Sequence, residues 1–395
     1  MRITRPALPV SRAHVARHRL VPRLTAAVAT AVLLVSAACG DGATAPRGGR
    51  VPAALQRIVD SIATAARMPG VVVAVRRPGG GGFTLTSGVA DLQTRRPMRD
   101  ADRFRVASVT KPMVATVVLQ LVDEGRLALD TPLAAYLPGL VPGADRITVR
   151  QLLNHTAGLP DYTNDDAFLA QVIAEPGRSW TPQELLAVAN RMAPTFAPGA
   201  PGRWAYSNTD YIVLGLLVEQ VSRRTLAQEL QARVFDRLAM RSTSYSTSPS
   251  LPAPYAEGYT DLDDAQRDVP VGTLVSPTWG GAAGAVVSTA DDLARFAEAL
   301  AAGTLLSPAL HAERLRTVPA SVLRFPEDRY ESAYGLGVLV GGGWVGHNGA
   351  IPGYEAEAFA RPGVGAVVVL VNRTTDTGAS HAIFAAVRDA SFGAP

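Results

Sequence analysis

Apolar and polar residues follow a helical period near the start of the folded part of the chain and then change to the pattern of a β-hairpin. Over residues 52–67 the apolar positions recur every three or four residues, which places them on one face of a helix. Residues 70–75 form a β-branched run, a Pro/Gly-rich stretch at 78–82 turns the chain, and residues 83–89 run back. The pattern therefore predicts a helix followed by a hairpin.

The middle of the chain, from Thr110 to about Leu300, has a mostly helical pattern with long loops. The segment from Thr181 to Glu184 has the features of a helix start, with an N-cap threonine, a proline in the first turn and a capping-box glutamate. The other expected helices are Met113–Glu124, Tyr211–Val221, Leu226–Phe235 and Ala290–Ala301.

Strand patterns return in the last part of the chain. Strands at both ends around a helical middle predict one sheet built from both ends, and hence an α/β (α+β) fold. One domain would cover residues 52–395, with sheet parts at about 52–107 and 285–395 and an inserted, mostly helical subdomain at about 111–284. The expected late elements are strands at Tyr334–Val340, Trp344–Gly346, Tyr354–Ala360 and Ala366–Val371, and a closing helix at His381–Arg388.

The first 38 residues have the pattern of an export signal. Their first part is arginine-rich, and residues 24–38 form a largely apolar run of 15 residues, too short to span a bilayer and typical of a signal peptide. The run ends in small residues before Cys39, which resembles a bacterial lipoprotein cleavage site, except that Ser36 stands where leucine is usual. We expect a signal peptide over 1–38, lipidation at Cys39 or else ordinary secretion, and a flexible tether over 39–51. The protein would be exported, periplasmic or anchored as a lipoprotein, and would meet the membrane only through that anchor.

The charge of the chain changes once this leader is removed. The formal net charge is +4, but the leader holds six of the 38 basic residues and no acidic residue. The remaining 32 basic and 34 acidic residues leave a net charge of −2, so nucleic-acid binding is not expected. A single cysteine allows no disulfide within the chain, and the four histidines beyond the leader lack metal-ligand spacing, so we expect no metal or other cofactor.

Lys111 is the only lysine in the chain. A lysine in a chain that otherwise uses arginine suggests a group that gives up its proton near neutral pH; the alternative is an arginine-biased composition that left one lysine by chance. Ser108 lies three residues earlier, on the same face of a helix. Pro112 places the start of that helix near Ser108, because proline is tolerated only in the first turn, where free N–H groups favour developing negative charge. A serine and a lysine in contact form a nucleophile pair when burial lowers the lysine pKa.

Two further motifs could supply chemistry. Tyr206 and Asn208 lie in a Gly/Pro-rich loop, where a tyrosine can shuttle a proton and an asparagine can bridge a lysine and a substrate amide. The alternative there is a packed tyrosine with an asparagine that caps a helix. His347, Asn348 and Gly349 follow a short strand, and a glycine at a strand edge lets a substrate backbone approach. The alternative for this motif is a turn between two strands.

Together, Ser-x-x-Lys at a helix start, Tyr-x-Asn on a loop and His-x-Gly on a late strand resemble the motifs of the serine β-lactamase and penicillin-recognising D,D-peptidase superfamily. The likeness is greatest to class C β-lactamases, to D,D-carboxypeptidases whose third motif begins with histidine, and to related esterases; it extends from about residue 52 to the C-terminus. It implies a β-lactamase/transpeptidase-like fold with an antiparallel sheet flanked by helices. The same resemblance is seen in Phe104–Ala107, Leu152–Leu159, Tyr206–Tyr211, Gly284–Thr289 and His347–Tyr354.

The resemblance also implies roles for individual residues. Ser108 would be the acylated nucleophile, Lys111 its activating base, and Tyr206 a group that exchanges protons with Lys111. Asn208 would position the substrate and the lysine. The backbone N–H groups of Ser108 and Ala350 would form the oxyanion hole. The remaining substrate-binding candidates are His347, Asn348 and Gly349.

The third motif departs from that of class C β-lactamases, which begin it with lysine followed by threonine. Here His347 and Asn348 take those places, so a permanent second cation and a hydroxyl for a substrate carboxylate are missing. His347 would be mostly neutral at pH 7, with a reference pKa of about 6.5. Desolvation by the helical subdomain, together with nearby arginines, would then have to lower the pKa of Lys111. His155 is another general-base candidate, although a loop histidine bonded to the backbone is the simpler interpretation.

These observations predict an exported serine hydrolase that works through an acyl-enzyme. Its small-molecule or peptide substrate could be a D-Ala-terminated peptidoglycan peptide, a β-lactam or a small ester, because a fold does not by itself set the substrate. The sequence has no GxSxG elbow, which excludes an α/β-hydrolase. The alternatives are an esterase of the same fold and a non-catalytic binding or scaffold protein that kept the fold.

Overall fold

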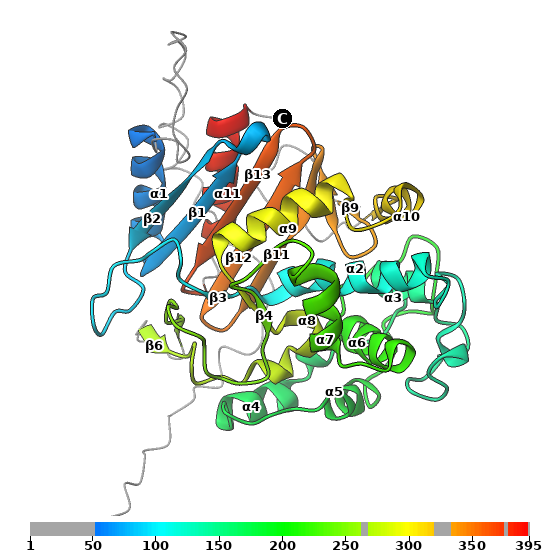
Figure 1. Cartoon of the computed structure of the whole chain (residues 1–395). Coiled ribbons are helices and arrows are strands. Elements are labelled where there is room, and N and C mark those ends of the chain that lie inside the picture. Colours follow the sequence, from blue (N-terminus) through cyan, green and yellow to red (C-terminus); the bar gives the residue numbers. More distant parts are fainter. Residues whose placement is uncertain (1–51, 262–267, 320–332, 375–377, 394–395) are drawn as a thin grey trace, which may run out of the picture.

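An eight-stranded sheet combines strands from both ends of the chain (Figure 1). The computed structural model describes residues 52–261, 268–319, 333–374 and 378–393; the predicted signal peptide, Cys39 and the tether lie outside them. Neighbouring strands of this sheet pair antiparallel, which confirms the expected architecture. In spatial order the strands are β2 (Gly82–Gly88), β1 (Gly70–Arg76), β13 (Gly365–Val371), β12 (Tyr354–Arg361), β11 (Trp344–Ile351), β10 (Leu339–Gly341), β9 (Ala333–Tyr334) and β8 (Val318–Pro319).

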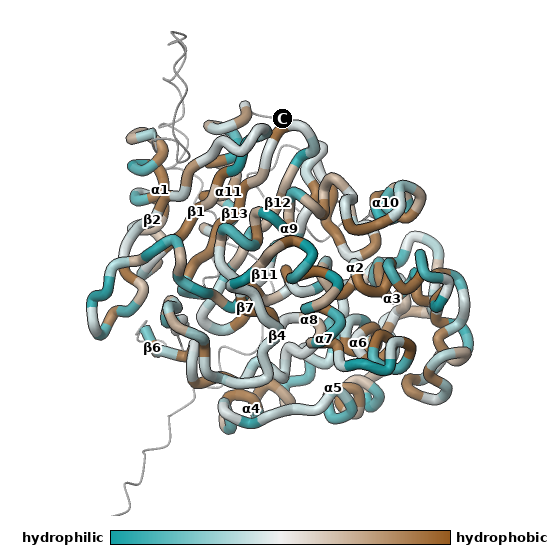
Figure 2. Tube along the Cα trace, in the orientation of Figure 1, coloured by the Kyte–Doolittle hydropathy of each residue, from teal (hydrophilic) through white to brown (hydrophobic). Residues whose placement is uncertain are grey.

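Helices cover both faces of this sheet. Val73 points into the core beneath α1 (Ala53–Ala65) and α11 (Ala379–Phe392), whereas its neighbour Val72 belongs to the core on the other face, with α9 (Ala290–Ala302). β1 and β13 are buried on both faces and are accordingly almost continuously apolar, as the hydrophobic colouring of Figure 2 shows. Each fully buried valine contributes about 1.5–3 kcal/mol of hydrophobic stabilisation.

Helix α2 (Thr110–Asp123) joins the sheet to the helical part of the molecule. Eleven of its 14 residues are buried, as is expected of a helix enclosed on all sides. It packs against α6 (Asn208–Ser222) and against β11, and one hydrophobic core extends through both regions. The inserted region is thus not a separately packed unit. Its other helices include α3 (Val149–Leu153), α4 (Asp166–Ala174), α5 (Pro182–Ala189), α7 (Leu226–Leu230) and α8 (Gly281–Gly284), and α10 (Pro308–Arg314) follows α9.

The predicted helix start at Thr181 is confirmed. The Thr181 hydroxyl accepts a hydrogen bond from the Glu184 backbone N–H, and the Glu184 carboxylate accepts one from the Thr181 N–H. Such a capping box satisfies donors that the first turn of α5 would otherwise leave unpaired.

The structure corrects two of the expected strands. Residues 334–340 do not form one strand: β9 and β10 are joined by a tight turn, in which Gly337 adopts a φ of +78° and lies against Ala115 of α2. β11 is longer than the predicted Trp344–Gly346 and extends to Ile351. The His-x-Gly motif therefore lies inside a strand and not in a turn; it pairs with β12, whereas β10 pairs only with Trp344–Gly346 on the other side.

Two smaller sheets complete the described fold. β3 (Phe104–Arg105), β7 (Val286–Ser288) and β4 (Ser244–Tyr245) form a three-stranded sheet just before the predicted nucleophile, and β5 (Tyr259–Asp261) pairs with β6 (Asp268–Pro270).

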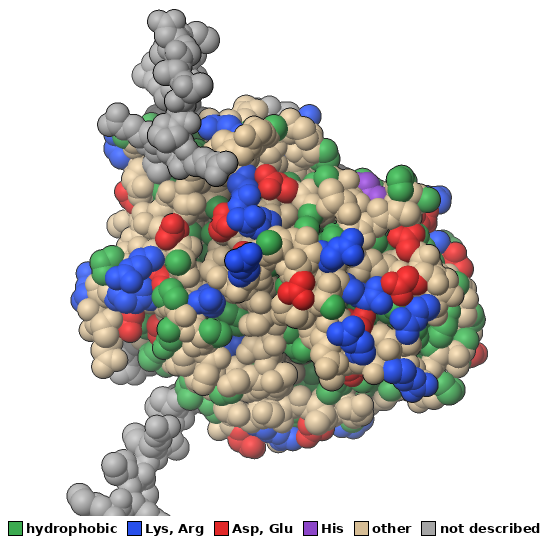
Figure 3. Space-filling view, viewed as in Figure 1, with side chains coloured by type: hydrophobic (Ala, Val, Ile, Leu, Met, Phe, Trp, Pro, Cys, Tyr) green, Lys and Arg blue, Asp and Glu red, His purple; other side chains and the backbone are tan. Residues whose placement is uncertain are grey.

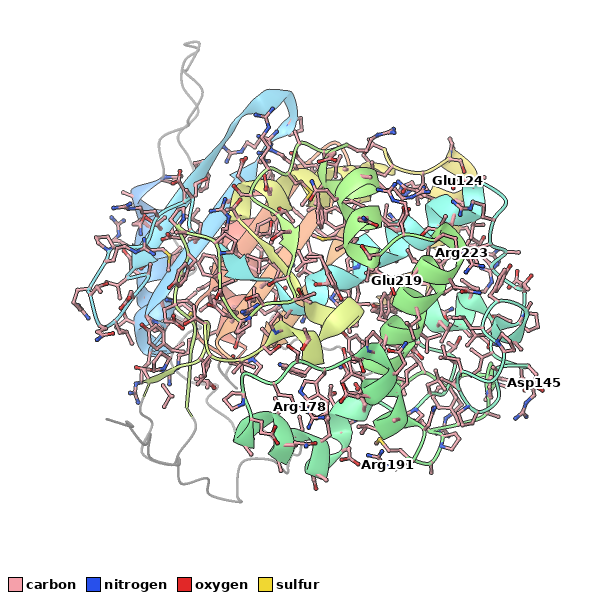
Figure 4. The ribbon with its side chains drawn as sticks, turned by 60° about the horizontal axis from the view of Figure 1, so that its bottom comes forward. Glu124, Asp145, Arg178, Arg191, Glu219 and Arg223 are labelled. Atoms are coloured by element: carbon pink, nitrogen blue, oxygen red, sulfur yellow. The ribbon has the colours of Figure 1, made fainter. Side chains whose placement is uncertain are left out.

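Charged side chains of both signs are interspersed over the face drawn in Figure 3. In Figure 4, Asp145, Arg191 and Arg223 project from the helical part into solvent. Within the described residues, no helix has the length and apolar character needed to cross a membrane.

Candidate active site

Ser108 lies in a single 3₁₀ turn, Ala107–Val109, that leads directly into α2. Ala107 adopts a left-handed φ of +48°, an uncommon conformation for a residue with a side chain, and thereby sets the angle at which the turn enters the helix. Lys111 is fully buried in the first turn of α2, and its Nζ lies 3.0 Å from Ser108 Oγ. The structure thus brings the predicted serine and lysine into contact.

Three oxygen atoms surround the Lys111 amine. Besides Ser108 Oγ, these are Asn208 Oδ1 at 2.8 Å and the Ala283 carbonyl oxygen at 2.9 Å. Carbonyl and amide oxygens can only accept hydrogen bonds, whereas a serine hydroxyl can also donate one. A neutral amine has two N–H donors and one lone pair. When the two fixed acceptors take both donors, the lone pair is directed at the Ser108 hydroxyl.

Burial lowers the pKa of Lys111 to about 7, although the carboxylates of Asp161 and Asp210 act in the opposite direction and raise it. Desolvation is therefore the dominant cause, as the sequence suggested. The charged groups that act on this pKa are carboxylates and not the expected arginines. Near neutral pH, Lys111 is present in both its neutral and its protonated form.

Tyr206 is the second side chain in contact with Ser108 Oγ. Its hydroxyl donates to Ser108 Oγ at 2.8 Å, and Lys111 Nζ lies 4.7 Å from the centre of its ring. Burial raises the pKa of Tyr206 well above its usual range. The residue is therefore a neutral phenol in the resting site. It can donate and relay a proton, but it is not a phenolate that could act as the base.

Asn208 is the first residue of α6 and does not lie in the loop predicted for it. The preceding residue, Ser207, is the N-cap, so the alternative in which Asn208 caps the helix is wrong. The Asn208 amide N–H donates to Asp161 Oδ2 at 3.0 Å and lies 3.2 Å from Thr163 Oγ1, while its oxygen accepts from Lys111.

His347 lies in the sheet beside these groups but is 2% exposed. Its Nε2 lies 2.9 Å from the Tyr334 hydroxyl, and its Nδ1 contacts the Asn348 carbonyl. Burial, and to a smaller degree the charge of Lys111, lower the pKa of His347 to about 3, so the ring is neutral at physiological pH. His347 supplies a buried neutral link to Tyr334 and no cation for a substrate.

A hollow opens directly beside Ser108. Of the predicted residues, Ser108, Asn208 and Ala350 line it, whereas His347, Asn348 and Gly349 do not. No lining residue carries a basic side chain, and two large aromatic side chains and one isoleucine contribute apolar surface. The lining residues are Ala107, Ser108, Tyr162, Thr163, Asn208, Trp279, Gly280, Ala283, Gly284, Ala350 and Ile351.

Gly349 instead allows β11 to approach the turn Ala107–Val109 that carries Ser108, called here the nucleophile turn. A Cβ at this position would lie 2.6 Å from the Val106 carbonyl oxygen and 2.8 Å from the Ser108 backbone nitrogen. Both contacts are with backbone atoms, which cannot rotate away. The missing side chain therefore permits the close packing that places Ala350 and Ser108 on the same hollow.

Gly349→Ala should lower kcat by at least about 100-fold, because β11 and the nucleophile turn must move apart and displace the reacting groups. Steady-state hydrolysis of p-nitrophenyl butyrate, together with circular dichroism, measures the effect. Gly177→Ala is the matched control, since nothing lies within 4 Å of a Cβ at Gly177. Wild-type rates in folded Gly349→Ala would show that the close approach is irrelevant to activity.

His155 has a different environment from the one predicted. It is fully buried, and its Nδ1 lies 2.8 Å from Asp210 Oδ2, so its main partner is a carboxylate and not the backbone. Its carbonyl accepts from the Ala205 N–H, and the centre of its ring lies 4.5 Å from that of the Tyr206 ring. Burial lowers its pKa well below the usual range. His155 therefore holds the backbone just before Tyr206 and packs against the Tyr206 ring.

Sequence reasoning missed three residues of this site: Asp161, Thr163 and Tyr334. The first two follow directly after the Leu152–Leu159 stretch, so the signal was a polar pair beside a stretch already noted. Tyr334 was assigned to a strand with no functional signal. Within the described part of the chain, no group of three or more potential metal-ligating side chains occurs.

A larger open groove of about 420 Å³ lies at the far end of α2, between Asp123, Arg233 and Ser307. It contains none of the groups described above and no serine–lysine contact. The chemistry therefore points to the smaller hollow at Ser108.

Comparisons with known proteins agree with this geometry. The family described as Beta-lactamase matches residues 55–391. The esterase EstB of Burkholderia gladioli is 30% identical over 378 residues, which cover 86% of this chain and 95% of the esterase. A D-stereospecific amidohydrolase from Streptomyces sp. superposes with a TM-score of 0.74 at 34% identity, over 86% of this chain and 97% of that one. A D-amino acid amidase from Ochrobactrum anthropi SV3 gives 0.75 at 28% identity, over 85% and 97%.

Proposed function

Because this chain belongs to the beta-lactamase family of serine hydrolases, we propose that it hydrolyses neutral esters and amides through an acyl-enzyme on Ser108. Members of this family are enzymes, so the alternative of a non-catalytic binding or scaffold protein is wrong. The observation that carries the proposal is the contact of Ser108 Oγ with both Lys111 Nζ and the Tyr206 hydroxyl at the edge of the hollow.

In the proposed first step, neutral Lys111 takes the Ser108 proton while Oγ attacks the substrate carbonyl carbon. The lysine becomes an ammonium, which the acceptors at Asn208 and Ala283 can bind. The carbonyl oxygen becomes an oxyanion, and the backbone N–H groups of Ser108 and Ala350 are the proposed donors to it. Both residues line the hollow where the carbonyl would lie.

The leaving group then departs with a proton. Tyr206 is suited to deliver it, because its phenol is neutral and lies against Ser108. The Lys111 ammonium restores the Tyr206 proton, and the lysine is neutral again for the second half of the reaction. Water attacks the acyl-enzyme with Lys111 and Tyr206 in the same roles, which releases the acid and regenerates Ser108.

The charge of the hollow favours neutral substrates. A carboxylate brought beside Ser108 would lose water without gaining a fixed cation from the described lining residues, and His347 is neutral. This argues against β-lactams and D-Ala-terminated peptides, which carry a carboxylate, as preferred substrates. Tyr162, Trp279 and Ile351 favour an apolar or aromatic acyl group. The similarity to an esterase, to a D-stereospecific amidohydrolase and to a D-amino acid amidase supports this choice.

A matched pair of substrates tests the charge argument. A short acylated D-peptide ending in a carboxamide should be cleaved with a kcat/KM at least about tenfold higher than the same peptide ending in a free carboxylate, a difference of ~1.4 kcal/mol. p-Nitrophenyl butyrate and D-phenylalanine amide serve as small substrates without a carboxylate, and a cephalosporin serves as the β-lactam. Preference for the carboxylate forms would contradict the proposed substrate class while leaving the acyl-enzyme intact.

We further propose that the protein is exported and lipidated at Cys39, as the leader sequence suggests. The mature protein isolated from membranes should begin at Cys39 and carry lipid. An unmodified Cys39 at the mature N-terminus would support secretion but contradict lipidation. An uncleaved leader would contradict export.

A further inference from the structure

We propose that Asp161 is a positioning residue for the Ser108–Lys111 pair, a role that rests on the function proposed above. Asp161 is 8% exposed, and its contacts Thr163 and Asn208 line the hollow. A continuous series of contacts joins it to the nucleophile. Asn208 Nδ2 donates to Asp161 Oδ2 at 3.0 Å, Asn208 Oδ1 accepts from Lys111 Nζ at 2.8 Å, and that nitrogen lies 3.0 Å from Ser108 Oγ.

These contacts fix which end of the Asn208 amide faces the lysine. A side-chain amide has one accepting and one donating end, and a carboxylate can only accept. Asp161 therefore holds the NH₂ end and leaves the oxygen for Lys111. Thr163 strengthens the arrangement, because its backbone N–H and its hydroxyl both donate to Asp161 Oδ1, at 3.0 and 2.8 Å. The hydroxyl proton is thus engaged, and the Thr163 oxygen can only accept from Asn208, at 3.2 Å.

Asp161 also acts through its charge. Burial raises the pKa of Asp161, while the hydrogen bonds from Thr163 and Asn208 and the charge of Lys111 lower it. Its negative charge in turn raises the pKa of the lysine and would stabilise the ammonium formed when Ser108 is deprotonated. The titratable groups that contact or act on Lys111 are Asp161, Asp210, His155, His347, Tyr206 and Tyr211.

The histidines and tyrosines of this set are uncharged near neutral pH, because burial lowers the pKa of each histidine and raises that of each tyrosine. Only the carboxyl groups can therefore balance the lysine charge. Burial raises the pKa of Asp210 well above its usual range, which favours its uncharged form, and its hydrogen-bond partner is His155, whereas Asp161 is connected to Lys111 through a single side chain.

Asp161→Asn separates these effects from general stability. The substitution keeps the shape and can keep the Oδ1 acceptor for Thr163, but it sets one NH₂ group against the other at Asn208. We expect kcat to fall by about 10- to 100-fold with KM changed by less than about threefold. The substitution displaces the lysine but leaves the binding of the substrate unchanged. The midpoint of the rise of kcat/KM with pH should move to lower pH, because a negative charge that raised the lysine pKa is gone.

The exchange variant Asp161→Asn/Asn208→Asp tests the same series of contacts in reverse. The amide at position 161 can donate to the carboxylate at position 208, which restores the hydrogen bond and sets the negative charge directly against Lys111. The midpoint of the rise of kcat/KM with pH should therefore lie at higher pH in the exchange variant than in the wild type. Asp165→Asn is the matched control: Asp165 caps α4 by accepting from the Phe168 N–H and does not join the series.

The single lysine of the chain allows a direct measurement. Selective ¹³C labelling of lysine gives one side-chain signal, whose pH titration reports the Lys111 pKa in the wild type and in each variant. The proposal predicts a lower value in Asp161→Asn, a higher value in the exchange variant and no change in Asp165→Asn. A reduced rate with an unchanged lysine titration would make Asp161 purely structural and overturn the proposal, as would wild-type kinetics in Asp161→Asn. If Ser108 is never acylated in the wild type, the proposed function fails, while the lysine titration still reports separately on Asp161.

Discussion

Ser108→Ala should reduce the hydrolysis of p-nitrophenyl butyrate by at least about 10³-fold and abolish covalent labelling of the protein. Ser108 Oγ is the atom on which the Lys111 and Tyr206 contacts converge, at 3.0 and 2.8 Å. Removing it leaves the lysine lone pair and the tyrosine hydroxyl without a reacting partner. The fold should be retained, because the change deletes one atom at the edge of an open hollow. Acid-quenched intact-mass spectrometry, followed by peptide mapping, measures acylation and locates it.

Ser207→Ala is the matched control for this variant. Ser207 is also buried and close to the site, but its Oγ has no hydrogen-bond partner among the described residues. Loss of that oxygen should therefore leave turnover within about threefold of the wild type, because no contact of the nucleophile is removed. Substantial turnover in Ser108→Ala, or labelling at another residue, would contradict the acyl-enzyme mechanism.

The local parts of this site could be predicted from the sequence. Ser108 and Lys111 are three residues apart at a helix start, and helix geometry alone brings such a pair together. The sheet built from both chain ends followed from strand patterns at 70–88 and 354–371, of which the nearly continuous apolar runs at 70–75 and 365–371 mark strands buried on both faces.

The parts that depend on distant contacts could not be predicted. Asp161 meets Asn208 across 47 positions, and His155 meets Asp210 across 55, so no periodicity connects either pair. The sequence alone does not show that Asp210 is the partner of His155, so it favours the interpretation of His155 as a loop histidine bonded to the backbone. Only the packing of α3 and the following loop against α6 gives its ring a carboxylate.

The extension of β11 was missed for a related reason. His347, Asn348 and Gly349 interrupt the apolar alternation that marks a strand, and taken locally they favour a turn. The register with β12 decides otherwise: His347 pairs with Ala358 and Gly349 with Ala356. The polar residues remain in the strand because pairing with β12 satisfies the backbone on that side and the Tyr334 hydroxyl meets the histidine ring.

Lys111→Arg should be nearly as inactive as Lys111→Ala, with both at least about 10³-fold below the wild type. A guanidinium keeps the positive charge but cannot give up its proton near neutral pH, and so cannot accept one from Ser108. In the wild type, a lysine with a pKa of about 7 is roughly half neutral at pH 7. An unperturbed lysine, with a pKa of about 10.4, would be neutral there in fewer than about one molecule in a thousand.

The sign of the pH dependence follows from the same values. The neutral amine is the reactive form, so the acylation rate should rise with pH through about 7 and then level off. Stopped-flow measurement of the acylation rate between pH 5 and 9 follows this rise. A flat profile would show that the protonated lysine is the working form. Significant activity in Lys111→Arg would show that the lysine supplies only charge, and its status as the only lysine of the chain would then have no catalytic meaning.

Chemical rescue distinguishes a lost base from a damaged fold. Lys111→Cys, made in a Cys39→Ser background so that it is the only thiol, should be inactive until alkylation with 2-bromoethylamine rebuilds a primary amine on a side chain of nearly the same length. Recovery of acylation after alkylation, but not after treatment with a reagent that adds an uncharged group, would assign the effect to the amine. Because Lys111 is fully buried, alkylation is carried out on the unfolded chain before refolding. Failure of a refolded, alkylated sample with native circular dichroism to recover activity would count against Lys111 as the base.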